Sequence, residues 1–245
     1  MSEAVLEVTM IVFGVNSVLE ALAASGAHVE NVSVAGKRGN PRLQEIIDRA
    51  RQLGIPVHFE PPEALTRKAG TRGHQSVIAE VTEAALVHFD EVLAARPERI
   101  LLLDGVEDPR NLGAVLRTAE AIGIKSVLLP QRRSCGVTPT VVRTSAGAAL
   151  HLRIGRIGNV VQTLEKLKEA GYWRIGLDMR GSEDSSGIDR SAPLVIVVGG
   201  EDRGLRRLVR EHCDFLIRLP MRGEVTSLNL SVAAGILLYS LFAES

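Results

Sequence analysis

Apolar residues occur along the chain in two patterns. Uninterrupted runs predict strands, and apolar residues at helical spacing predict the helices between them. Three uninterrupted apolar runs are typical of strands covered on both faces of a parallel sheet: Ile100–Leu103, Val127–Leu129 and Leu194–Val198. Apolar residues at helical spacing predict helices over about 111–122, 158–170, 204–211 and 227–242. This succession of strands and helices predicts an α/β fold with a C-terminal parallel sheet.

The first third of the chain predicts a smaller α/β unit. Helices are expected over Val15–Ala24 and Pro41–Leu53, the second of which begins with Asn40-Pro41. Short strands are expected over Val32–Ala35, Val57–Phe59 and Val77–Val81. We therefore predict a first domain at 1–80, a linker at 81–98 and a second domain at 99–245.

Composition restricts the possible functions. A net charge of +0 argues against a protein that coats nucleic acid non-specifically, and 3% aromatic residues argue against base stacking as the main binding mode. Cys135 and Cys213 lack the spacing of a metal site or a disulfide framework. The acidic N-terminus does not resemble a signal peptide, and no apolar run is long enough to span a bilayer. We expect a cytoplasmic protein without metal or membrane partner.

A polar segment, Asp104–Ala119, follows the first of the three strands. Asp108 or Asn111 could cap the next helix. The apolar stripe of that helix leaves Arg117 off the buried face, free to point to solvent or to a site. Taken alone, a capped helix with a solvated arginine explains this segment at least as well as a site does.

A glycine-bearing loop, Val197–Leu205, follows the last of the three strands. Its glycines would let the backbone approach a ligand closely. The loop matches neither the dinucleotide-binding fingerprint nor a phosphate-binding loop. A tight turn between strand and helix, with Glu201 paired to Arg203 or Arg206 on the surface, is the competing interpretation.

The third segment, Leu219–Tyr239, places a polar cluster at the start of an apolar helix. The cluster comprises Thr226, Ser227, Asn229 and Ser231. Capping accounts for one of these side chains but not for all of them. Three polar loops in one domain therefore predict one composite site.

Together and in this order, the three segments resemble the signature motifs of the SpoU/TrmH superfamily of RNA ribose 2′-O-methyltransferases. The matching residues are Asn111…Arg117-Thr118, then Gly200-Glu201…Gly204-Leu205, then Pro220-Met221…Gly223…Ser227-Leu-Asn229…Ser231. The second motif departs from many relatives at Asp202, which stands where they have glycine. Phe13–Asn16, Val18–Leu22 and Gly73–Ser76 resemble the domain related to ribosomal protein L30e that binds substrate in the RlmB-like rRNA guanosine branch.

The resemblance implies a SPOUT fold, in which the C-terminal domain is tied into a deep trefoil knot and binds S-adenosylmethionine. The cofactor-binding residues it implies are Gly199, Gly200, Leu219, Met221, Leu228 and Thr144. It assigns activation of the ribose hydroxyl to Arg117, as base or as stabiliser of the alkoxide, with Asn111, Glu201, Ser227 and Asn229 orienting the reactants. It also implies a homodimer, in which the apolar tail Ile236–Phe242 is either interface or core.

Basic residues gather on a few loops, and Lys37, Arg38 and Arg72 are the predicted RNA contacts. A solvated basic face is the alternative. The favoured function is methylation of a guanosine in large-subunit (23S) rRNA. A tRNA or antibiotic-resistance rRNA 2′-O-methyltransferase is the second, and a non-catalytic RNA-binding protein belongs to a different class. A dinucleotide-dependent enzyme is disfavoured because its fingerprint is missing.

Overall fold

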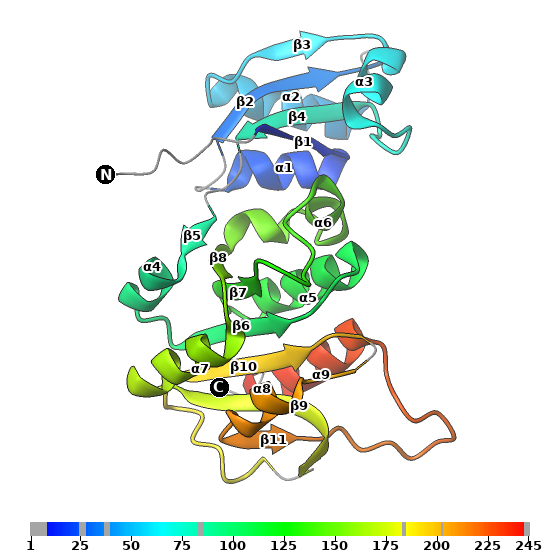
Figure 1. Cartoon of the computed structure of the whole chain (residues 1–245). Coiled ribbons are helices and arrows are strands. Elements are labelled where there is room, and N and C mark those ends of the chain that lie inside the picture. The colour runs from blue at the N-terminus through cyan, green and yellow to red at the C-terminus, as the bar shows by residue number, and fades with distance from the viewer. Residues whose placement is uncertain are drawn as a thin grey trace. The chain divides into compact units, whose positions relative to one another are not determined.

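The computed structural model describes residues 9–24, 28–36, 40–82, 86–182, 185–201 and 203–242. The chain divides into two compact units, coloured along the sequence in Figure 1. The first comprises Met1–Ala85 and Val137–His151, and the second comprises Leu86–Gly136 and Leu152–Ser245. The predicted boundaries therefore need two corrections. Residues 86–98 belong to the second unit instead of forming a linker, and residues 137–151 join the first.

The first unit contains a four-stranded sheet in the order β1-β4-β2-β3. Its strands are β1 (Thr9–Phe13), β2 (His28–Val34), β3 (Val57–Phe59) and β4 (Val77–Thr82), and only the β2–β3 pair is parallel. The helices are α1 (Val15–Ala23), α2 (Pro41–Gln52), α3 (Pro62–Ala69) and α6 (Pro139–Thr144), with a 3-10 turn at Ala148–His151. β1, α3, α6 and the 3-10 turn are additions to the predicted elements.

Capping and burial explain the predicted start of α2. The side chain of Asn40 accepts the backbone N–H of Arg42 at 3.1 Å, and Pro41 occupies the first turn. The buried positions of the helix repeat at helical spacing: Leu43, Ile46, Ile47 and Ala50. They pack in one core cluster with strand residues such as Val32 and Ala79, which are fully buried.

The second unit is built on a seven-stranded sheet in the order β11-β9-β10-β6-β7-β8-β5, in which every pair is parallel. The three predicted runs form its centre as β6 (Arg99–Asp104), β7 (Ser126–Pro130) and β10 (Leu194–Gly199). The remaining strands are β5 (Val87–His88), β8 (Arg153–Ile157), β9 (Trp173–Ser182) and β11 (Phe215–Ile217). The parallel C-terminal sheet is thus confirmed.

The helices of the second unit are α4 (Phe89–Ala94), α5 (Pro109–Ala121), α7 (Val160–Glu169), α8 (Arg207–Glu211) and α9 (Leu230–Phe242). α8 and α9 each begin about one turn later than predicted. In α9 this is because residues 221–229 have no regular structure, and the side chain of Asn229 accepts the N–H of Ser231 at 2.9 Å. Figure 1 shows the chain looping outward between β11 and α9.

All seven strands run in one direction, so the loops after β6, β7, β9, β10 and β11 leave the same edge of the sheet. Ligands of open parallel sheets bind outside this carboxyl edge. The three motifs predicted from the sequence therefore lie at the edge where a site is expected. Among the described residues, no helix is long and apolar enough to cross a membrane.

Candidate functional site

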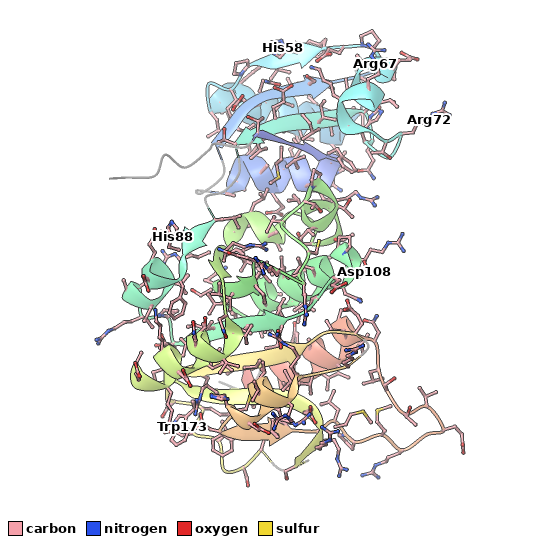
Figure 2. All side chains as sticks on the ribbon, viewed as in Figure 1. His58, Arg67, Arg72, His88, Asp108 and Trp173 are labelled. Carbon is pink, nitrogen blue, oxygen red and sulfur yellow. The ribbon has the colours of Figure 1, made fainter. Side chains whose placement is uncertain are left out.

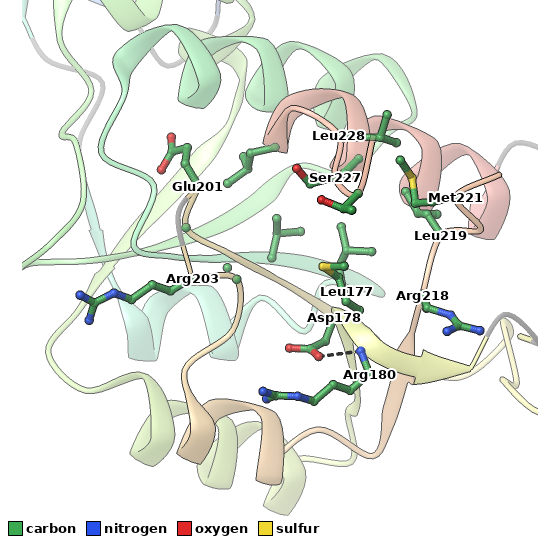
Figure 3. Close-up of a pocket in the computed structure, with 18 of the residues that line it drawn as sticks. Leu177, Asp178, Arg180, Glu201, Arg203, Arg218, Leu219, Met221, Ser227 and Leu228 are labelled. Carbon is green, nitrogen blue, oxygen red and sulfur yellow. Dashed lines mark hydrogen bonds between the residues drawn. The ribbon is translucent and has the colours of Figure 1, made fainter. Parts of the chain in front are cut away.

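A cavity of about 550 Å³ opens at the carboxyl edge of the parallel sheet (Figure 3). Its lining comes from β9, from β10 and its loop, from the segment after β11, and from the start of α9. Seven of the predicted site residues line it: Gly199, Gly200, Glu201, Leu219, Met221, Ser227 and Leu228. Separate segments of the sequence thus line one cavity.

The glycines of the β10 loop allow the backbone of the protein to fold tightly on itself. A Cβ atom on Gly199 would lie 2.1 Å from the carbonyl carbon of Gly204, and one on Gly200 would lie 2.5 Å from the oxygen of Gly105. Gly204 has φ +60, and a Cβ there would meet no atom within 4 Å. Gly199 and Gly200 are therefore required by contacts within the protein, in addition to any contact with a ligand.

An ion pair fixes the end of the same loop. Arg206 donates from Nε and Nη2 to the two carboxylate oxygens of Asp104 at 2.9 and 2.6 Å. The Asp104 side chain is only 2% exposed, whereas that of Arg206 is 49% exposed. This bidentate contact ties the end of β6 to the start of α8. The competing interpretation, in which Glu201 could pair with Arg206 on the surface, is therefore wrong for Arg206.

Hydrogen bonds join one residue from each of the three motifs. Nδ2 of Asn111 donates to Oε1 of Glu201, and Nδ2 of Asn229 donates to Oδ1 of Asn111, both at 3.0 Å. Oδ1 of Asn229 in turn accepts the hydroxyl of Ser231 at 2.6 Å. Asn111 uses both ends of its amide, so its orientation is set by the other two motifs. We call Glu201, Asn111 and Asn229 the amide chain.

Arg117 is not part of this cluster. It lies on α5, is exposed, and does not line the cavity. Asn111 is in the first turn of α5 and Arg117 follows six residues later, which at about 100° per residue puts them on different faces. Across the part of the chain that the structure describes, its guanidinium has no hydrogen bond or ion pair. Its role stays a prediction.

The other predicted contacts lie in the first unit. Thr144 is the last residue of α6, where its hydroxyl donates to the carbonyl of Thr140 at 2.9 Å, and it does not line the cavity. Arg72 is exposed and projects from the turn after α3, near Arg67 (Figure 2). Lys37 and Arg38 lie outside the described residues.

Sequence patterns missed one wall of the cavity, which consists of β9 residues Leu177, Asp178, Met179 and Arg180. Asp178 accepts the backbone N–H of Arg180 at 2.9 Å, the dashed line in Figure 3, and lies 3.4 Å from Nη1 of Arg210. No continuous apolar run reveals β9, because Arg174 is buried in it as the partner of Asp214 at 2.6 Å. Because the paired arginine interrupts the apolar residues of β9, the hydropathy pattern does not predict this strand.

The lining of the cavity combines apolar and charged side chains. Leu177, Val198, Leu219, Leu228 and Leu230 supply apolar surface, and charged groups surround it: Asp178, Arg180, Arg203, Arg210 and Arg218. Neither cysteine has the character of a nucleophile, since burial raises the pKa of Cys135 and raises that of Cys213 to about 12. The described residues contain no cluster of groups able to hold a metal ion.

Two family profiles match the chain. The SpoU rRNA Methylase family matches residues 98–239, which contain the three motifs. A family described as RNA 2′-O ribose methyltransferase substrate binding matches residues 11–87. The two matches correspond to the large parallel sheet and to the four-stranded sheet.

Relatives match nearly the whole chain. A Bacillus subtilis protein named as TrmH family tRNA/rRNA methyltransferase YacO is 40% identical over 236 residues, or 94% of each chain. A tRNA/rRNA methyltransferase of Mycobacterium avium is 41% identical over 95% of this chain and 76% of its own. Among solved structures, an RNA 2′-O ribose methyltransferase superposes with a TM-score of 0.77, 29% identity, and coverage of 96% and 88%. AviRb from Streptomyces viridochromogenes, in complex with AdoMet, shares the fold with a TM-score of 0.78, 24% identity, and coverage of 96% and 90%.

Proposed function

Because the chain belongs to the SpoU rRNA Methylase family, we propose that it transfers a methyl group from S-adenosylmethionine to a ribose 2′-hydroxyl of RNA. One observation carries this proposal. The amide chain joins all three motifs beside the cavity, which Glu201 lines, although Asn111 is 90 residues from Glu201 and 118 from Asn229. A strand-to-helix turn or a helix cap alone would not require that convergence.

The residues present fit the cofactor. The cavity volume, about 550 Å³, lies within the usual range of small-molecule sites. We expect Gly199, Gly200, Leu219, Met221 and Leu228 to hold the adenosine part between backbone amides and apolar side chains. Thr144 remains a predicted contact. When bound, the cofactor supplies an electrophilic methyl group on a positively charged sulfur.

The protein's own part in the reaction is to hold the hydroxyl and its developing charge. A ribose hydroxyl is a weak nucleophile until its proton is removed or strongly held. We assign the orientation of the ribose to the amide chain and Ser227. Arginine is a poor base, because its guanidinium keeps its proton far above neutral pH. We therefore assign Arg117 the stabilisation of the alkoxide, with a water or an RNA phosphate taking the proton.

The exposed face of α9 supports a homodimer. Val232, Ile236 and Tyr239 repeat at helical spacing and are 49%, 45% and 50% exposed. α9 packs on α5, the helix that carries Arg117. A dimer through this face would place Arg117 beside the interface, and light scattering should give twice the mass of one chain. A monomer with full activity would contradict it. The knot implied by the resemblance is part of the same proposal.

For the substrate, we favour a guanosine of large-subunit (23S) rRNA, contacted by Arg72 together with Lys37 and Arg38. The match of residues 11–87 to a substrate-binding family supports an RNA substrate. The tRNA/rRNA methyltransferase names of the relatives keep tRNA as the second candidate. A non-catalytic RNA-binding protein would not need the amide chain beside a cofactor-sized cavity.

Arg117→Ala tests the proposal. We expect methyl transfer to fall by about 10²–10³-fold, the usual effect of removing one donor to an oxyanion. The affinity for S-adenosylmethionine should not change, since Arg117 does not line the cavity. The assay uses radiolabelled cofactor with rRNA and tRNA from cells lacking the protein, and maps 2′-O-methyl marks by their resistance to alkaline cleavage.

The matched control is Arg153→Ala, another exposed arginine, at the amino end of β8 and so at the opposite edge of the sheet. It should leave both measurements unchanged. If the wild-type chain binds no S-adenosylmethionine, the proposed function is wrong. Methylation by Arg117→Ala at the normal rate would instead refute only the role of that residue.

A further inference from the structure

The loop after β7, Gln131–Gly136, carries two arginines that the catalytic proposal does not use. Arg132 and Arg133 are both exposed. In the described ranges of the chain, neither guanidinium has a hydrogen bond or an ion pair. Two unpaired positive charges side by side repel one another, and an anion bound between them would relieve that repulsion. We call residues 131–136 the arginine loop.

The backbone of the arginine loop is held in place. Gln131 donates its N–H to the carbonyl of Ile157 at 2.8 Å, and Cys135 donates to the carbonyl of Val106 at 2.9 Å. Arg133 has φ 58, a left-handed conformation that a bulky residue adopts only where the surroundings impose it. The two side chains therefore project from a defined position.

A third guanidinium adds positive charge behind the loop. Nη2 of Arg156 donates to the carbonyl of Gln131 at 3.3 Å, while its Nη1 is buried and has no partner among the described residues. The negative charge of Asp108 raises the pKa of the Cys135 thiol and the positive charge of Arg156 lowers it. The carboxylate of Asp108 accepts the backbone N–H of Arg110 at 2.7 Å. Arg156 therefore adds a third positive charge beside the loop, which favours an anion there.

The order of the strands places the loop next to the amide chain. β10, β6 and β7 are consecutive in the sheet, and neighbouring strands are about 4.8 Å apart. The cofactor-sized cavity lies on the β9–β10 side and the arginine loop on the β7–β8 side. The amide chain, whose Asn111 follows β6, lies between them. A strand of RNA whose ribose faces Asn111 would thus bring a neighbouring phosphate to the arginine loop.

We infer that the arginine loop is a phosphate-binding site, in which Arg132 and Arg133 hold the RNA backbone beside the nucleotide that is methylated. The inference rests on the proposed function for the identity of that nucleotide. It assigns RNA contacts to the second unit, separate from Lys37, Arg38 and Arg72 in the first. Such contacts position the RNA and carry no base specificity.

The test compares Arg132→Ala/Arg133→Ala with Arg96→Ala/Arg153→Ala in the full chain. The control pair removes the same charge from exposed arginines at the amino edge of the same sheet. It also contains one left-handed arginine, since Arg96 has φ 45. Binding of a fluorescein-labelled RNA hairpin is followed by anisotropy over a series of KCl concentrations. We expect the loop variant to bind more weakly and to lose about 1–2 from the slope of log K against log salt.

A lysine pair, Arg132→Lys/Arg133→Lys, should keep most of the slope, because the slope depends on the number of phosphates that positive charges neutralise. The control pair should behave as wild type. Equal slopes for the loop variant and the control pair would overturn the phosphate site. The phosphate site would also be overturned if the lysine pair lost as much slope as the alanine pair. A misfolded loop would then explain the weaker binding of both variants. Titration with S-adenosylmethionine distinguishes the two proposals. If the wild-type chain does not bind the cofactor, the proposed function is refuted, but the comparison of salt slopes still tests the phosphate site.

Discussion

The two walls of the cavity that the motifs build are held in opposite ways. In the β10 loop, Gly204 donates its N–H to the carbonyl of Gly200 at 3.1 Å, and Arg206 is paired to a buried carboxylate. In the segment after β11, residues 221–229 are all exposed. No backbone N–H of residues 219–229 donates to a backbone carbonyl of the described residues. One wall is complete without a ligand, and the other has its amides free.

The two walls therefore contribute differently to cofactor binding. A preformed wall binds without ordering cost, whereas an open wall pays conformational entropy when the ligand arrives. Free amides along residues 219–229 are also the donors that an adenine and a carboxylate need. We infer that the β10 loop sets where the cofactor binds and that the segment after β11 closes on it.

Gly199→Ala is expected to have the largest effect, because it breaks the preformed wall. The new Cβ would lie 2.1 Å from the carbonyl carbon of Gly204, a backbone atom that cannot move without opening the loop. We expect cofactor binding to be abolished, with a loss of at least about 1–3 kcal/mol in the free energy of unfolding. Calorimetric titration and urea denaturation measure the two quantities.

Gly223→Ala is the matched control in the open wall. A Cβ on Gly223 would meet nothing within 4 Å. Stability should stay within about 0.5 kcal/mol of wild type. If the two variants behave alike, the contrast between the walls is wrong.

Hydrogen exchange should show a smaller effect that separates the walls directly. Without ligand, the amides of residues 221–229 should exchange fast, because they are exposed and unbonded, and the amide of Gly204, which donates to the carbonyl of Gly200, should exchange more slowly. Adding S-adenosylmethionine should slow exchange mainly in residues 219–229. Equal protection of both segments would show that the β10 loop also opens before binding.

The same contrast explains how far the sequence could predict the molecule. Uninterrupted apolar runs revealed β6, β7 and β10, because strands buried on both faces need no polar residue. β9 was not predicted, because the burial of Arg174 depends on Asp214, which is 40 residues away. The start of α9 was placed one turn early because apolar spacing continues through Leu228, which the structure leaves exposed.

The composition of the site was easier to predict than its geometry. The order of the motifs identified Asn111, Glu201 and Asn229, which hydrogen bonds then connect. The pairing of Arg206 with Asp104 could not be seen, because only the fold shows that the two loops are neighbours. For the same reason the sequence could not place residues 137–151, which pack with the first unit.

The smallest effect concerns Cys213, which packs under the preformed wall in one core cluster with Leu205 and Val209. Burial raises its pKa to about 12, compared with about 8.5 for an exposed thiol. Above about pH 8.5 the unfolded chain loses this proton while the folded chain keeps it, so the free energy of unfolding must fall as pH rises. The fall is at most about 1.4 kcal/mol per pH unit.

Cys213→Ala removes this contribution and leaves every other titrating group in place. Urea denaturation of wild type and variant at about pH 8 and about pH 10 should therefore show that the stability of wild type relative to the variant decreases with pH. If the difference in the free energy of unfolding between wild type and variant is the same at both pH values, the thiol ionises as easily in the folded chain as in the unfolded chain. Water would then reach the core beneath Leu205, and the β10 loop could not be the rigid wall of the site.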